Sequence, residues 1–145
     1  MFKLKHIMIS PVITVYQEDS VYDAMATLRR HNITGTPVID NNGALVGIIT
    51  EKDLLRFLYA AEIKNPKVKD FMTKEVICFD AEDSMINVAE CFVKNEARRV
   101  PILEKNKVVG IISKKDIIDY ILKMRAVGEG ELALQSIQST ENGHL

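Results

Sequence analysis

A seven-residue motif occurs twice in this chain, and the duplication constrains the fold more than any other feature. Gly-Ile-Ile-Thr-Glu-Lys-Asp at residues 47–53 recurs as Gly-Ile-Ile-Ser-Lys-Lys-Asp at residues 110–116, 63 positions later. Each copy combines an apolar strand that ends at a hydroxyl residue with a helix that has an Asp in its first turn. The motif therefore predicts two equivalent units in one chain.

The elements that precede and follow the motif are duplicated as well. In the first half we predict a strand, an amphipathic helix capped by Ser20, a hairpin and a second helix, at residues 11–15, 21–31, 36–50 and 51–65. Equivalent residues lie 64 positions later in the second half, where Met72 corresponds to Met8 and Pro101 to Pro37. The second hairpin is one residue shorter, which reduces the offset to 63. Both halves therefore have the order β-α-β-β-α.

One unit of about sixty residues buries so little surface that it would be only marginally stable alone. We therefore predict an α+β fold in which two β-α-β-β-α repeats pack sheet-to-sheet about a pseudo-two-fold axis. The predicted boundaries are residues 5–65 for repeat 1, 66–125 for repeat 2, and 126–145 for a polar, flexible C-terminal tail.

Composition limits the partners. The net charge of −1 and the pI near 6.3 give no electrostatic footprint for nucleic acid. The longest apolar runs are too short to cross a bilayer, and the N-terminus has no secretory h-region. Cys78 and Cys91 lie in apolar patterns without a neighbouring ligand cluster, which predicts two reduced core thiols. We expect a cytoplasmic protein that contacts neither nucleic acid nor membrane.

Catalytic machinery is not evident. His6, His31 and His144 are scattered, with no partner at catalytic spacing. The chain has no nucleophile elbow, glycine-rich phosphate loop, metal-ligand cluster or paired carboxylates where a reaction would need them. We therefore expect no enzyme activity, no cofactor and no metal.

The duplicated motif has two interpretations. A hydroxyl followed three residues later by Asp resembles a helix capping box, although the usual third residue is Glu or Gln. Alternatively, the helix start can hold an anion, and the Asp can accept two hydrogen bonds from a ribose diol. The duplication does not decide between them, because a structural cap would be duplicated too. Both roles can coexist.

Taken together, the motifs resemble a tandem pair of CBS domains, or Bateman module, over residues 5–125. The resemblance consists of a Met before the first strand, x-Pro at the second, and Gly-h-h-[Ser/Thr]-x-x-Asp at the last, in both repeats. It implies a non-catalytic regulatory, energy-sensing module that binds AMP, ADP or ATP, with S-adenosylmethionine as an alternative. The ligand would occupy clefts between the repeats, and the module would act in trans on another protein.

The resemblance also implies which residues bind the ligand. In the family, the Asp holds the ribose diol and the Ser or Thr contacts phosphate. The first cleft would contain Ile13, Ile33, Thr34, Arg99, Ser113 and Asp116. The second cleft would contain Thr50, Asp53, Ile77, Ala97 and Arg98. Because Gly35 occupies the position equivalent to Arg99, the second cleft has one fewer phosphate donor, and we rank the first cleft as the better site.

Family members commonly form disc-like homodimers through the helices that follow the Asp motifs. The apolar residues Leu54, Leu55 and Leu58, and Ile117, Ile118 and Ile121, fit such an interface or an intramolecular core equally well. The alternative to a ligand sensor is a structural dimerisation module without a small-molecule ligand, whose Asp motifs act only as caps.

Overall fold

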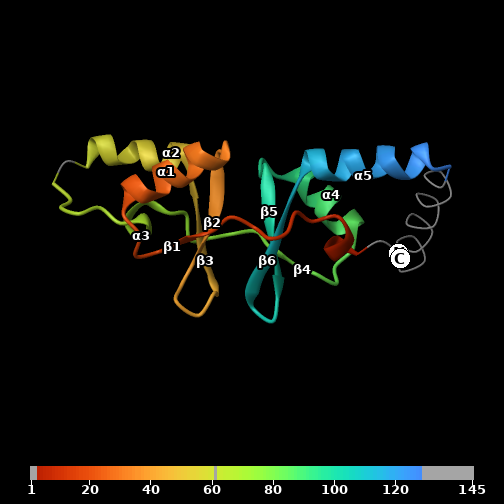
Figure 1. The fold of residues 1–145 in the computed structure, drawn as a ribbon, viewed down its shortest axis with the longest axis horizontal. Helices are drawn as coiled ribbons and strands as arrows, with labels where there is room; N and C mark the ends of the chain where they lie inside the picture. Colours follow the sequence, from red (N-terminus) through yellow and green to blue (C-terminus); the bar gives the residue numbers. More distant parts are fainter. Residues whose placement is uncertain (1–2, 61, 129–145) are drawn as a thin grey trace. The chain divides into compact units, whose positions relative to one another are not determined.

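The computed structural model describes residues 3–60 and 62–128, and within these residues it contains two three-stranded sheets. The chain divides into two compact units. The first unit comprises residues 12–60, 62–76 and 105–108. The second unit comprises the described parts of Met1–Pro11, Ile77–Glu104 and Val109–Leu145. In each unit the main helices lie on one face of its own sheet (Figure 1).

In the first unit, β1 (Val15–Tyr16) runs parallel to β2 (Gly35–Ile39), which pairs antiparallel with β3 (Leu45–Thr50). The helices are α1 (Val21–His31), α2 (Glu51–Leu55), which continues as the 3-10 turn η2 (Arg56–Tyr59), and α3 (Val68–Phe71). Alternate strand residues and one stripe of each helix form the core. Its buried residues are Val15, Val21, Ala24, Leu28, Val38, Ile49, Leu54, Val68 and Phe71.

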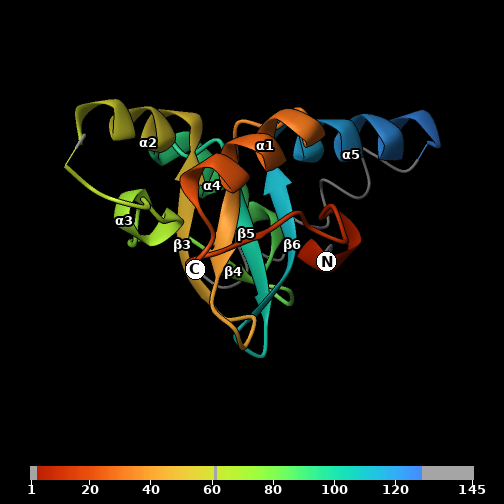
Figure 2. The same cartoon turned by 60° about the vertical axis from the view of Figure 1, so that its left-hand side comes forward.

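The second unit repeats this arrangement. Its sheet contains β4 (Phe79–Asp80), β5 (Arg99–Glu104) and all but the first two residues of β6 (Lys107–Ser113). Its helices are the 3-10 turn η1 (Leu4–His6), α4 (Met85–Lys94) and α5 (Lys114–Ala126). Helix α5 begins at the carboxyl end of β6 (Figure 2). The buried core residues are Leu4, Ile7, Ala81, Met85, Val88, Phe92, Val100, Ile102, Ile112 and Ile117.

Local sequence explains the element ends. The Ser20 hydroxyl accepts a hydrogen bond of 3.0 Å from the Asp23 N–H and caps α1, and Asn32 ends this helix in the left-handed conformation with φ 52°. In the first hairpin, the Asp40 carboxylate accepts from the backbone N–H groups of Asn42 and Ala44, at 2.8 and 3.0 Å. These caps and turns confirm the predicted order of elements.

The segment that leads into each repeat packs in the compact unit of the other repeat. Leu4 is fully buried in the core of the second unit, and Val68 is fully buried in that of the first. The backbone follows the same scheme, because Ile9 N–H donates to the Ile111 carbonyl at 2.9 Å and Thr73 exchanges two 2.9 Å bonds with Ile48. Residues 5–11, predicted to begin repeat 1, therefore belong to the second compact unit, and residues 66–76, predicted to begin repeat 2, belong to the first.

The structure confirms the α+β class and the β-α-β-β-α order, while the sheet-to-sheet packing of the repeats stays a prediction. The first strand of each repeat is shorter than predicted, because residues 12–14 and 76–78 pair with no neighbouring strand. The predicted helix 51–65 is observed as α2 and η2, which end at Tyr59, and Leu55 and Leu58 face solvent rather than a core. Helix α5 extends to Ala126, and the rest of the predicted tail from residue 129 lies outside the described residues.

Both cysteines are free thiols, as predicted, but they are half-buried rather than core residues. Partial burial without an ionic partner raises the pKa of the Cys78 thiol. Within residues 3–60 and 62–128, no helix combines the length and apolarity that a membrane crossing requires.

Candidate functional site

The first copy of the motif forms a complete capping box. Strand β3 ends at Thr50, whose Oγ1 accepts a hydrogen bond of 3.2 Å from the Asp53 N–H. The Asp53 carboxylate reaches back, and its Oδ2 accepts from the Thr50 N–H at 3.1 Å and from the Thr50 hydroxyl at 3.0 Å. The capping interpretation of this motif is therefore confirmed.

The second copy forms the same box at the start of α5. The Ser113 Oγ accepts from the Asp116 N–H at 3.2 Å, and the Asp116 Oδ2 accepts from the Ser113 N–H at 2.8 Å. The negative carboxylate also complements the positive end of the helix dipole. Both hydroxyl–Asp pairs thus hold the junction between the last strand and the following helix.

The two carboxylates differ in their remaining contacts. Asp53 is only 3% exposed, and its Oδ1 lies 3.2 Å from Arg56 Nη1 and 3.5 Å from the Thr73 hydroxyl. Asp116 is half-buried, and among the described residues its Oδ1 has no hydrogen-bond or ion-pair partner. The Asp116 carboxylate therefore keeps one oxygen available to a ligand.

Arg99, which was predicted to contact phosphate, lies in the second unit together with Arg98, Ala97 and Ile77. Arg99 is half-buried at the first position of β5, the strand next to β6 and its terminal Ser113. Arg98 directly before it is exposed, Ala97 is half-buried, and the Ile77 side chain is 44% exposed. Arg99 is the first residue of β5 and Ser113 is the last residue of the neighbouring strand β6. This placement suits two groups that bind the same phosphate.

The first unit contains the remaining predicted residues. The Thr34 carbonyl accepts from the Glu51 N–H at 2.9 Å, which connects Thr34 to the start of α2. The Ile13 carbonyl accepts from the hydroxyl of Thr36, a buried residue outside the set of predicted site residues. Each predicted cleft takes residues from both units, so the structure places these residues within their units and their assembly into clefts stays a prediction.

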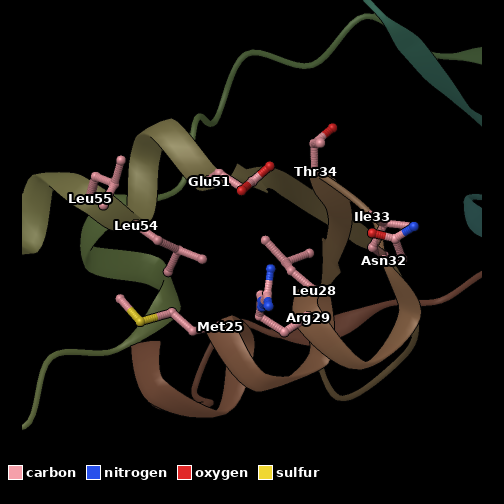
Figure 3. Close-up of a pocket in the computed structure, with 9 residues that line it drawn as sticks. All are labelled: Met25, Leu28, Arg29, Asn32, Ile33, Thr34, Glu51, Leu54 and Leu55. Atoms are coloured by element: carbon pink, nitrogen blue, oxygen red, sulfur yellow. The ribbon is translucent and has the colours of Figure 1, made fainter.

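A cavity of about 310 Å³ lies between α1 and α2 of the first unit (Figure 3). Its nine lining residues are Met25, Leu28, Arg29, Asn32, Ile33, Thr34, Glu51, Leu54 and Leu55. Two of these, Ile33 and Thr34, were predicted site residues, whereas Thr50 and Asp53 do not line it. The spacing of Met25 and Leu28 indicates only the apolar face of a helix, so this pattern contains no signal for a cavity. Within the described residues, no cluster of three or more His, Cys, Asp or Glu side chains could hold a metal ion.

The comparison with protein families decides the identity. The CBS domain model matches residues 4–60 and 68–123, which is most of the chain. The chain belongs to the CBS-domain family. The two matches coincide with the two sequence repeats and confirm the tandem CBS pair.

Several proteins resemble this CBS pair. It is 38% identical over 117 residues to inosine-5'-monophosphate dehydrogenase of Methanocaldococcus jannaschii, covering 80% of the chain. The chain spans 23% of that enzyme and 42% of a second relative from the same organism, the uncharacterized protein MJ1225. The CBS region is therefore a minor part of these relatives.

Solved structures share the fold. The CBS domain pair of protein MJ0100, in complex with 5'-methylthioadenosine and S-adenosyl-L-methionine, is 30% identical, with a TM-score of 0.72. That match covers 83% of this chain and 95% of the MJ0100 chain. CBSX2 of Arabidopsis thaliana, in complex with AMP, gives a TM-score of 0.79 over 86% of this chain and 99% of its own. Its 24% identity supports the fold alone.

Proposed function

We propose that this CBS pair is a non-catalytic regulatory module that binds an adenosine-containing ligand, with Ser113 and Asp116 as principal contacts. The observation that carries the proposal is the half-buried Asp116 carboxylate, which is fixed through Oδ2 and keeps Oδ1 without a partner among the described residues. The 30%-identical CBS pair of MJ0100, whose complex contains two adenosine compounds, supports the ligand class.

The capping box prepares this site for a nucleoside. Because the Ser113 N–H holds Asp116 Oδ2, the carboxylate is oriented before a ligand arrives, which reduces the entropic cost of binding. A ribose diol can donate to the remaining oxygen. The Ser113 Oγ already accepts from the Asp116 N–H, so its hydroxyl hydrogen can be donated to a phosphate. Arg99, on the neighbouring strand, supplies a positive charge of the type that binds phosphate.

The ligand that best fits these groups is a mononucleotide such as AMP, ADP or ATP, with S-adenosylmethionine as the alternative. Its adenine would contact the apolar residues Ile13 and Ile33, while Thr34 completes the site. The second set, formed by Thr50, Asp53, Ile77, Ala97 and Arg98, would be the weaker site. Ligand would act by binding two arrangements of the repeats with unequal affinity, because equal affinity shifts no equilibrium.

A second copy of the chain is the proposed partner of the helical surface. Leu55 and Leu58 are 59% and 66% exposed in the first unit, and Ile118 and Leu122 are 57% and 58% exposed in the second. Exposed apolar side chains grouped on the helices after both Asp motifs fit the homodimer that the family resemblance implies. The module would be cytoplasmic and would act in trans on another protein.

One observation favours the alternative of a structural dimerisation module. Both capping boxes are complete, so they account for the Ser or Thr and the Asp of each motif without any ligand. Under this alternative, removal of Asp116 would lower the stability of the fold but would not change any interaction with nucleotides.

A thermal-shift panel of AMP, ADP, ATP and S-adenosylmethionine separates the two functions. A ligand at a hundred times its Kd adds about 2.7 kcal/mol to the free energy of unfolding. We expect one ligand to stabilise the wild type and Asp116→Asn to remove most of that gain. Ser20→Ala is the matched control, since it removes a cap outside the motif. Folded protein that no compound stabilises would favour the structural module.

A further inference from the structure

The Asp53 carboxylate is saturated by groups of its own unit. Its Oδ2 accepts from the Thr50 N–H and hydroxyl, and its Oδ1 faces the Arg56 guanidinium at 3.2 Å and the Thr73 hydroxyl at 3.5 Å. The Thr50 hydroxyl donates its hydrogen to Asp53 Oδ2, so it cannot donate to another group at the same time. No oxygen of Asp53 and no hydroxyl hydrogen of Thr50 is therefore left for a nucleoside in this state.

The equivalent positions of repeat 2 cannot make these contacts. Arg56 corresponds to Asp119, whose carboxylate accepts from Lys115 at 2.7 Å and has no hydrogen to donate. Thr73 corresponds to Ile9, which has no side-chain hydrogen-bonding group. The structure supports this equivalence, because Thr73 bridges to Ile48 and Ile9 bridges to Ile111 at matching places in the two sheets.

We infer that Arg56, assisted by Thr73, is an internal competitor that closes the Asp53 motif to a ribose diol, so that each chain offers one open adenosine site, at Asp116. This inference rests on the proposed function and assigns the two motifs unequal roles. Arg56 occupies the Asp53 oxygen that corresponds to the available Oδ1 of Asp116. A diol at Asp53 must first displace the guanidinium.

The geometry makes Arg56 a removable block. The Arg56 side chain is 53% exposed, so it can turn into solvent without disturbing the core, while the Asp53 side chain is 5% exposed and stays in place. Displacement leaves a buried carboxylate that needs new donors, and a diol supplies two. The second site is therefore a latent one that opens when Arg56 leaves.

Titration calorimetry with AMP, and a parallel series with S-adenosylmethionine, tests the inference through the number of sites. For the wild type we expect one strong site per chain, lost in Asp116→Asn and kept in Asp53→Asn. The double variant Arg56→Ala/Thr73→Val removes both donors, and we expect it to bind a second equivalent. Lys52→Ala is the matched control, because Lys52 is an exposed cation of the same helix without a contact to Asp53.

The reciprocal variant tests the same inference at an exposed position, where misfolding is not expected. Asp119→Arg introduces a guanidinium three residues after Asp116, and we expect it to weaken binding at that site about tenfold, the effect of one competing charged hydrogen bond. Lys115→Ala is the control, because it frees Asp119 without adding a donor.

Different results overturn different statements. Two wild-type sites of similar affinity, one of them lost in Asp53→Asn, would overturn the closed-site inference and leave the proposed function intact. A single site in the folded double variant together with unchanged affinity in Asp119→Arg would also overturn it. Absence of binding by every variant would overturn the proposed function itself.

Discussion

Met72 packs directly over Gly47, and a Cβ added to Gly47 would stand 2.7 Å from the Met72 sulfur and 2.8 Å from the Thr73 carbonyl oxygen. Gly110 has the equivalent position in the second unit, where the three atoms nearest to an added Cβ all belong to the Met8 side chain. The methionine before the first strand of each repeat thus covers the motif glycine of the other repeat, and this contact explains why both residue types recur together.

Gly47→Ala is expected to lower the free energy of unfolding by about 1–3 kcal/mol, because a methyl group overpacks a site that a backbone carbonyl closes. Gly110→Ala should be milder, since the Met8 side chain can move. Urea denaturation measures both. Met8→Ala in the Gly110→Ala background should restore part of the loss, whereas Met72→Ala in the Gly47→Ala background should restore less. Equal rescue in the two units would contradict this explanation.

The repeat was predictable from sequence because duplicated strand and helix patterns need no tertiary information. Ser20, Ser84 and the Ser113–Asp116 pair all cap helices where local rules place them. The exchange of the leading segments was not predictable, because periodicity shows that Leu4 and Val68 are apolar but not which core they enter. The end of the helix after Thr50 was not predictable for the same reason, because periodicity does not show which apolar residues find a packing partner.

In each compact unit, one glutamate pairs with two lysines of the segment that leads into the other repeat. Lys67 and Lys69 hydrogen-bond to Glu18, each at 2.8 Å, and lower the pKa of its carboxyl from 4.5 to about 2. Lys3 and Lys5 do the same for Glu82 and lower its pKa to about 2. All four lysines belong to segments that lead into a repeat. The contacts are thus duplicated along with the fold.

The lowered pKa values of Glu18 and Glu82 predict that part of the free energy of unfolding is lost at acidic pH. Because the folded-state pKa lies below the unfolded value, each glutamate contributes its full stabilisation above about pH 4.5 and loses it as the pH falls toward 2. Glu18→Gln and Glu82→Gln should each flatten the dependence of Tm on pH in that window. The difference from wild type should shrink in high salt, since both pairs are exposed. Glu75→Gln, an exposed glutamate without an ion pair among the described residues, should follow the wild-type curve.

The candidate site was only partly predictable. The sequence placed Ser113 and Asp116 together, because three residues separate them across a helix start, and the structure adds their hydrogen bonds. It did not indicate that Arg56 and Thr73 meet Asp53, since Thr73 lies 20 residues away and arrives through the exchanged segment. The unequal state of two nearly identical motifs is therefore a product of tertiary structure.

Ser113→Ala should separate the cap from the ligand contact. Loss of the hydroxyl that caps α5 is expected to cost about 1 kcal/mol of unfolding free energy, as should the loss of the Ser20 cap on α1. Only Ser113→Ala should also weaken nucleotide binding, because only its hydroxyl is proposed to face a phosphate. Chemical denaturation and calorimetry on both variants give the comparison. Equal stability losses with unchanged binding in Ser113→Ala would remove Ser113 from the ligand site.

The helical surface allows a test of assembly that leaves the fold intact. Leu58 is 66% exposed, so Leu58→Glu should change the unfolding free energy by less than about 0.5 kcal/mol in the monomer. If this surface binds a second copy, the added charge is buried at the interface without a partner and dimerisation is lost. Sedimentation velocity should then show a dimer for the wild type and a monomer for the variant. Leu54→Ala should instead destabilise the fold without a specific effect on assembly. Leu54 is 2% exposed in the core, so its truncation should lower the free energy of unfolding by about 2–5 kcal/mol in monomer and dimer alike. A Leu58→Glu protein that sediments like the wild type would show that the apolar residues after the Asp motif have another partner.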